Sequence, residues 1–385
     1  LSSVKVIRPD DPAAQATVDA IFAEQDGWAG HFNEKRYAIL LTPGTYASTF
    51  RVPVTYYTSV HGVGQRPEDV VLSEVSSANG ANGHATNNFW RSFEGVTLTG
   101  DVTWAVSQGA PIRRSVIQGS LKLSDGEGYA SGGFIADTTV SGTVKPGMQQ
   151  QWFFRNMAMA GGVWCPMGWN YVFLGVENLD DATYDKCRST VPDKVTHNPI
   201  TPRVAEKPYL VAEEGGASWK VYVPAFANGA TVGTTKDHVS NAHLKLKLET
   251  EVFVVRPGMD AAAINQGMAG KKGALFTPGV YKLDAPIVVK TSRFVVLGIG
   301  FPTLIPVTGQ PAIRVLDGLA DVRLAGLLLE AGTPVGHAPT EPLLQWGSRG
   351  AKSDGPPTPA GVASDIFARV GSFKYQGCPV VRVDT

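Results

Sequence analysis

The sequence of 385 residues is poor in cysteine, has no net charge and contains no long apolar run. Its three cysteines, Cys165, Cys187 and Cys378, do not have the spacing of a metal site. No apolar run reaches the roughly 18 residues that a membrane-spanning helix needs. Lysine plus arginine and aspartate plus glutamate both number 34, which gives no reason to expect a nucleic acid or a membrane surface as partner. A neutral ligand fits this balance better than a polyanion.

Signatures of several active sites are also missing. No pair among the seven histidines has metal-ligand spacing on a predictable element. The segments Gly62-Val63-Gly64 and Gly298-Ile299-Gly300 lack the third glycine and the helix of a nucleotide site. No phosphate-binding loop and no Ser-His-Asp order occurs. We therefore expect neither a metal ion nor a cofactor.

Glycine and proline are abundant, with 43 and 26 residues. This composition favours many short strands joined by turns over long helices. Hydrophobic residues make up 43% of a chain that is too long for one ordinary core, so we expect two domains.

One motif occurs twice. The first copy is Thr42-Pro43-Gly44-Thr45-Tyr46, followed by Gly62-Val63-Gly64, and the second is Thr277-Pro278-Gly279-Val280-Tyr281, followed by Gly298-Ile299-Gly300. A short helical pattern precedes each copy, at 12–25 and at 257–269. The repeated order of helix, Pro-Gly turn and Gly-x-Gly indicates two related modules in tandem.

Short apolar runs broken by Gly, Asn, Asp and Ser recur between 37 and 175 at intervals of roughly 20–25 residues, the period of one solenoid coil. No long helical pattern separates them, which argues against βαβ units. We therefore predict an all-β chain with two tandem right-handed parallel β-helices, each opened by a short capping helix. The predicted domains are an N-terminal β-helix at 1–175, a long linker with a local hairpin at 176–250, and a C-terminal β-helix at 251–385.

Several blocks of sequence resemble one known family in the same order. These blocks are RYAILLTPGTY, VHGVG, NNFWRSFEGVTL, YASGGFIADTTVSGTV, QQQWFFRN, WNYVFLGVE, EKPYL, LFTPGVY, VVLGIGFPTLIP and VRLAGLLLEAG. The family is glycoside hydrolase family 55, in its bacterial form. The resemblance implies a secreted, monomeric enzyme that acts on β-1,3-glucan from the chain end, with inversion, in a cleft between two β-helices.

The resemblance also implies particular catalytic residues. A family glutamine that holds the attacking water maps to Gln149-Gln150-Gln151, and our choice is Gln150. The family serine that assists it maps to Leu174, which neither accepts nor relays a proton. The general acid is expected on later coils of the second β-helix, beyond Thr385.

Residues 149–173 combine aromatic rings with amides, which together bind neutral sugars. We expect substrate contacts from this stretch; an interior amide ladder and core aromatic rings are the alternative reading. The predicted substrate-binding residues are Gln149, Gln151, Trp152, Trp164, Trp169 and Tyr171. Glu177, just after this stretch, is our second candidate for a catalytic role. A Cys165–Cys187 disulfide and three buried thiols both remain open.

The leading functional hypothesis is a secreted hydrolase that releases glucose or short oligosaccharides from β-1,3-glucan. Because of Leu174, a catalytically silent glucan-binding or surface protein is the first alternative. A polysaccharide lyase on the same fold is the second, although the balanced charge speaks against a uronate substrate. The expected partner is a neutral polysaccharide.

Overall fold

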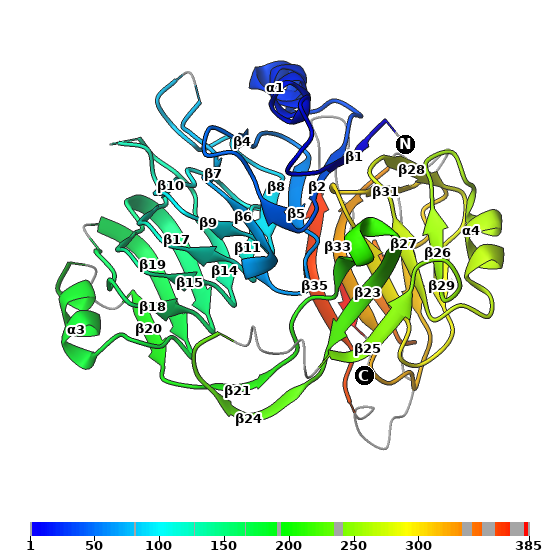
Figure 1. Ribbon diagram of the computed structural model, residues 1–385. Coiled ribbons are helices and arrows are strands. Elements are labelled where there is room, and N and C mark those ends of the chain that lie inside the picture. The colour runs from blue at the N-terminus through cyan, green and yellow to red at the C-terminus, as the bar shows by residue number, and fades with distance from the viewer. Residues whose placement is uncertain are drawn as a thin grey trace.

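The computed structural model describes residues 2–80, 82–126, 128–165, 167–190, 194–234, 242–332, 341–348, 359–369 and 381–383. Strands dominate this part of the chain, and they form two stacks of coils that lie side by side (Figure 1). The expected class, an all-β chain of parallel β-helix coils, is confirmed. None of the described helices is long and apolar enough to cross a membrane. These helices are α1 (Ala14–Gln25), α2 (Gly27–Gly30), α3 (Asp181–Thr190) and α4 (Ala261–Met268).

The first stack is built around a parallel sheet of nine strands. Its order is β1 (Val4–Ile7), β2 (Tyr37–Leu41), β5 (Thr58–Gly62), β8 (Arg91–Glu94), β11 (Ile112–Arg113), β14 (Gly133–Ala136), β17 (Met148–Arg155), β19 (Met167–Leu174) and β20 (Val195–Asn198).

Three further sheets complete the coils of this stack. The six-stranded one contains β18 (Ala158–Met159), β15 (Thr139–Val140), β12 (Val116–Ile117), β9 (Thr97–Leu98), β6 (Val70–Leu72) and β3 (Gly44–Thr45); the others contain β10 (Val102–Thr103), β13 (Leu121–Lys122) and β16 (Val144–Lys145), and β4 (Arg51–Pro53) and β7 (Glu74–Ser76).

Side chains of the nine-stranded sheet alternate between the core and the outer face, as the two-residue period of a strand requires. In β17, Trp152 and Phe154 are 1% and 0% exposed and lie in the core, whereas Phe153 and Arg155 point outward and are half-buried. Each coil then turns a corner through a residue with positive φ. These corner residues are Gly95, Arg114, Asp137, Asn156 and Gly175.

The second stack has its own core and its own parallel sheets. One sheet contains β26 (Val252–Val255), β27 (Gly273–Phe276), β30 (Val295–Gly298), β33 (Arg323–Glu330), β31 (Thr303–Pro306) and β28 (Val280–Leu283), with β35 (Val362–Arg369) paired to β33; the other contains β29 (Ile287–Val289), β32 (Ile313–Val315), β34 (Leu344–Trp346) and β36 (Val381–Val383).

The chain between the stacks is ordered over much of its length. The expected hairpin is present as antiparallel β22 (Tyr209–Glu213) and β23 (Ser218–Pro224), with β25 (Ala242–Lys247) beside them. A second antiparallel pair, β21 (Thr201–Val204) and β24 (Ala227–Thr231), runs beneath the stacks in Figure 1. Strand β20 and helix α3 follow residue 175 and pack on the first stack. The domain limits 1–175, 176–250 and 251–385 stay predictions.

The two stacks meet through the outer faces of their large sheets. Ala38 and Leu40 of β2 pack against Leu275 of β27 and Leu297 of β30. The approach is so close that a Cβ atom on Gly300 would lie 2.7 Å from the carbonyl oxygen of Tyr37. The second Gly-x-Gly segment therefore serves the contact between the stacks.

A disulfide joins Cys165 to Cys187, with 5.2 Å between their Cα atoms. It ties α3 to the end of the first stack, where Tyr184 is also buried. Cys378 lies outside the described residues.

Reduction of this disulfide is expected to lower the thermal unfolding midpoint of the protein. The bond closes a loop with a sequence separation of 22 residues, and a loop of this size contributes roughly 3 kcal/mol by restricting the unfolded chain. Calorimetry with and without reductant measures the shift, and Cys187→Ser should reproduce it. Cys378→Ser is the control, since it leaves the pair intact. An unchanged midpoint after verified reduction would contradict the expectation.

Candidate functional site

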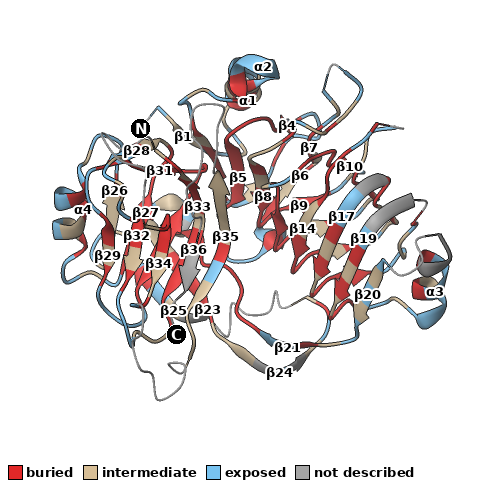
Figure 2. Ribbon diagram, turned by 180° about the vertical axis from the view of Figure 1, so that it is seen from behind, coloured by how far each residue is buried: buried red, intermediate tan, exposed pale blue. Residues whose placement is uncertain are grey.

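A cleft of ≈ 680 Å³ lies where the outer faces of the two large sheets diverge. The first stack contributes outward side chains of β11, β14 and β17, and the second contributes β35. In Figure 2, which shows the molecule from behind, β35 lies in the stack on the left and β14 and β17 lie in the stack on the right. The residues that line the cleft include Arg113, Phe134, Gln151, Phe153, Arg155, Asp365 and Phe367.

Aromatic rings cover the wall formed by the first stack. Phe134 and Phe153 are paired across β14 and β17, and their rings meet edge to face at 5.2 Å between centroids. The guanidinium carbons of Arg113 and Arg155 lie 4.7 and 5.3 Å from the centroid of Phe134. One aromatic surface thus adjoins two planar hydrogen-bond donors.

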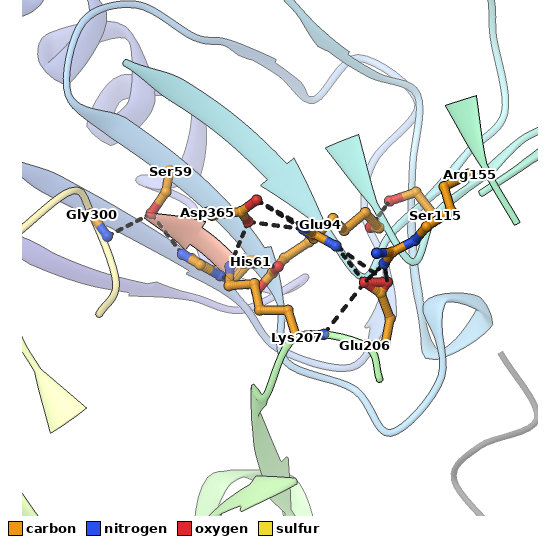
Figure 3. Close-up of polar contacts among 10 residues, drawn as sticks. Ser59, His61, Glu94, Ser115, Arg155, Glu206, Lys207, Gly300 and Asp365 are labelled. Atoms are coloured by element: carbon orange, nitrogen blue, oxygen red, sulfur yellow. Dashed lines mark hydrogen bonds and ion pairs between the residues drawn. The ribbon is translucent and has the colours of Figure 1, made fainter. Parts of the chain in front are cut away.

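A charged row crosses the outer face of the nine-stranded sheet and reaches the cleft at Arg113 and Arg155. Strand register places its members side by side: His61, Glu94, Arg113, Ala136, Arg155 and Leu174. The row is completed by Glu206 and Lys207 from the connection between the stacks and by Asp365 from β35 (Figure 3).

Arg113 is the centre of this network. Its Nε and Nη2 donate to the carboxylate of Asp365, at 2.9 and 2.8 Å, and its Nη1 donates to Glu206. Glu206 also accepts from Nη2 of Arg155, with 2.8 Å to each carboxylate oxygen. The two arginines therefore share one buried carboxylate that is 3% exposed.

Lys207 extends the network away from the cleft. Its Nζ donates to Glu94 at 2.8 Å and lies 3.6 Å from Asp365. Three cations, Arg113, Arg155 and Lys207, thus face the three carboxylates Glu94, Glu206 and Asp365. The charges balance, as buried charges require.

Burial and neighbouring charge set the protonation states. Burial disfavours ionisation of Glu206, but the charges of Arg113 and Arg155 outweigh it and hold the pKa below its usual value. Burial likewise disfavours ionisation of Glu94, but the charge of Lys207 and the hydrogen bond from His61 outweigh it and hold the pKa of Glu94 well below its usual range. Burial lowers the pKa of His61 against the opposing effect of Glu94, so its imidazole is neutral at neutral pH. Both carboxylates are hydrogen-bond acceptors and not proton donors.

Ser59, His61 and Glu94 have the connectivity of a catalytic triad. The Ser59 hydroxyl lies 2.6 Å from Nε2 of His61, whose Nδ1 lies 2.8 Å from Glu94. The backbone N–H of Gly300 donates to the Ser59 oxygen, however, at 2.8 Å. Ser59 is 2% exposed and adjoins a cavity of only ≈ 20 Å³, about one water molecule. The group joins the two stacks, and no substrate reaches the serine.

The structure brings one predicted site residue into the cleft. Gln151 faces outward from β17, is exposed and lines the cleft. Gln150, the predicted catalytic residue, is also exposed but is not among the lining residues; its role stays a prediction. The side chains of Gln149 and Trp169 lie outside those described.

Other predicted site residues lie away from the cleft. Trp152 and Tyr171 are 1% and 0% exposed and pack inside the first core. They therefore do not offer the substrate contact that the sequence predicted. Trp164 is 51% exposed next to the disulfide and does not line the cleft. Glu177 is exposed at the corner after β19 and does not line the cleft either, so its catalytic role gains no support.

Sequence reasoning missed the charged residues that meet at the cleft. Glu206 and Asp365 are separated from Arg113 by 93 and 252 residues in the chain. The only local signal was the adjacent Glu206-Lys207 pair before a strand. Among the residues that the structure describes, no group of three or more metal-binding side chains occurs.

Glu206→Gln is expected to destabilise the protein by about 3–5 kcal/mol, because it removes the charge shared by two buried arginines. The stabilisation from Glu206 is complete above the usual glutamate pKa of 4.5 and is lost as the pH falls through the lower folded-state value. Thermal unfolding between pH 7 and pH 3 should therefore show a smaller acid-induced decrease for this variant. Asp101→Asn is the control, since the Asp101–Lys122 pair is exposed and contributes little. Equal effects of both variants would contradict the assignment.

Comparison with known proteins identifies relatives along nearly the whole chain. The family model described as the LAM55 pectate lyase-like domain matches residues 252–384. An exo-beta-1,3-glucanase of Streptomyces sp. (strain SirexAA-E / ActE) is 38% identical over 375 residues, which are 96% of this chain and 58% of the relative.

Solved structures show the same likeness. The structure of sacteLam55A from Streptomyces sp. SirexAA-E has a TM-score of 0.85 and 36% identity, covering 96% of this chain and 64% of that one. A variant of sacteLam55A in complex with glucose matches with a TM-score of 0.85 and 37% identity, with the same coverage. The chain thus spans about three fifths of the length of these relatives. The identity over 96% of the chain, the shared fold and the matching domain at 252–384 agree with the family resemblance that the sequence indicated.

Proposed function

We propose that the protein is a secreted glycoside hydrolase that releases glucose or short oligosaccharides from β-1,3-glucan with inversion, in the cleft between the two stacks. The observation that carries this proposal is the 38% identity to an exo-beta-1,3-glucanase over 96% of the chain. The disulfide between Cys165 and Cys187 supports secretion, because such bonds persist in oxidising compartments.

The composition of the cleft supports a neutral sugar as ligand. Phe153 offers an aromatic surface to the C–H face of a sugar ring, and Gln151 and Arg155 offer amide and guanidinium groups to its hydroxyls. The charges of the network balance, so the cleft has no excess of positive charge for a uronate chain. This argues for a glucan and against a polysaccharide lyase.

Inversion requires an acid that protonates the leaving oxygen and a water that attacks from the opposite face, with roughly 6.5–9.5 Å between the two carboxyl groups in typical enzymes. Asp365 lines the cleft, but its carboxylate accepts two hydrogen bonds from Arg113. We therefore assign Asp365 and Glu206 to positioning of the arginines. The general acid, which the family resemblance places beyond Thr385, stays a prediction.

In this proposal a residue of the first stack holds the attacking water. Gln151 is the amide that faces the cleft, so we assign it this role in place of Gln150. Leu174 lies beside Arg155 in the charged row and supplies no hydroxyl there. For this reason a glucan-binding protein without activity remains the alternative function.

Gln151→Ala is expected to lower the turnover of laminarin by about 100-fold, because the water loses the group that positions it. Gln150→Ala is the matched control on the same strand and should retain turnover. Release of glucose measures both, and thermal unfolding checks that both variants fold. A loss confined to Gln150→Ala would return the role to that residue. Binding of laminarin without glucose release by the unmodified protein would favour the alternative function, and rising ultraviolet absorbance on a uronate polymer would indicate a lyase.

Leu174→Ser is expected to raise the turnover of laminarin several-fold, about 0.5–1.4 kcal/mol of transition-state stabilisation. The serine would restore the hydroxyl that the family resemblance maps to this position. Leu174→Ala controls for the loss of the leucine side chain alone. Equal turnover in both variants would show that proton transfer takes another route.

A further inference from the structure

Aromatic rings, two of them half-buried and two exposed, continue from one end of the cleft onto the surface of the molecule. We call Trp28, Phe32, Trp90 and Phe367 the aromatic strip. Trp28 and Phe32 are 73% and 55% exposed, which is high for large apolar side chains. Trp28 belongs to α2, which lies exposed at the top of the molecule in Figure 2.

The outer end of the strip is held rigidly. His31 stacks on Phe32 at 4.2 Å between ring centroids and on Tyr56 at 4.9 Å. Trp28 meets the same imidazole edge to face at 5.0 Å. His31 itself is 6% exposed and therefore forms the support beneath both exposed rings. Rigid aromatic surfaces lose little entropy when a ligand binds.

The inner end of the strip is continuous with the cleft. Phe367 lines the cleft and meets Trp90 edge to face at 6.2 Å. The Trp90 ring also lies over Gly109, another lining residue, where a Cβ atom would come within 2.8 Å of it. A ligand that leaves the cleft past these residues meets the strip next.

Arg369 connects the two ends. Its guanidinium carbon lies 5.5 Å from the ring centroid of Phe32 and 5.9 Å from that of Trp90. The guanidinium donates to the carboxylate of Glu330 and, at 2.5 Å, to the hydroxyl of Tyr57. Glu330 therefore balances the charge of Arg369, and the planar guanidinium of Arg369 lies between the rings of Phe32 and Trp90. Neutral sugars match this pattern, since their C–H faces stack on rings and their hydroxyls bind guanidinium and carboxylate groups.

We propose that the aromatic strip is a second binding surface for the polysaccharide, and that it holds the part of a β-glucan chain that extends beyond the cleft. The inference rests on the proposed function, because it takes the same chain as ligand. It adds selectivity for length: a chain of two or three glucose units occupies the cleft alone, whereas a polymer contacts both surfaces and gains affinity from the strip.

The test compares binding of laminarin and of laminaritriose by isothermal titration calorimetry. Trp28→Ala and Phe32→Ala remove exposed rings and leave both cores intact. Each variant should bind laminarin about 5- to 10-fold more weakly, the effect of one lost ring contact, and bind laminaritriose as the unmodified protein does. Tyr129→Ala is the matched control: Tyr129 is 57% exposed and stacks on His84 at 5.2 Å, but it belongs to neither the strip nor the cleft lining.

Each other outcome overturns the inference. If the two variants bind laminarin as tightly as the unmodified protein while laminaritriose still binds, the strip fails and the proposed function stands. If Tyr129→Ala weakens laminarin binding equally, the effect belongs to no particular surface. A changed oligomeric state of both variants with unchanged affinity would show that the strip contacts protein. If the unmodified protein binds neither sugar, the proposed function fails together with the strip.

Discussion

The arrangement of the molecule depends on one contact, the packing of two outer sheet faces against each other. Outer faces of stacked coils usually meet water, so strands such as β2 would carry polar side chains there. In this protein Ala38 and Leu40 are apolar on that face because the second stack covers them. The contact fixes the angle at which the sheets diverge, and the divergence opens the cleft.

Where the apolar contact ends, buried charge takes over. Arg113 pairs with Asp365 of the opposite stack and with Glu206 of the connection, so three separate parts of the chain meet at one guanidinium. Asp365 has a positive φ of 51°, at a position where the preceding coil has Gly326 with a φ of 68°. A corner that suits glycine is thus occupied by a residue whose carboxylate reaches across to the other stack, at some cost in backbone strain. Pairing with Arg113 offsets this strain.

Local patterns in the sequence predicted the repeated coils. They did not predict the contacts between residues that are far apart in the chain. The repeated Pro-Gly and Gly-x-Gly segments and the regular strand spacing were enough to predict stacked parallel coils. The glutamine run lies on β17, which lines the cleft, yet the shortness of the strands left open which of its side chains face outward. Trp152 and Tyr171 turned out to be core residues, and Gln151 an outer one. Glu206 and Asp365 reach Arg113 only after both stacks have formed, so no spacing in the sequence marks them.

The same division between inner and outer side chains explains how chemistry varies on this fold. An inward residue such as Phe154 is fixed by the Trp152 ring on its own strand and by the Phe173 ring of the next coil, because the core leaves no room for another shape. Outward side chains that face the cleft are not packed between neighbouring core rings, so their size and shape are less restricted. Row neighbours Ala136, Arg155 and Leu174 differ in size and charge although their backbones are in register, and of these three only Arg155 lines the cleft. A change at an outward position that lines the cleft, such as Gln151 or Arg155, alters the surface offered to a ligand without altering the packing inside the coil.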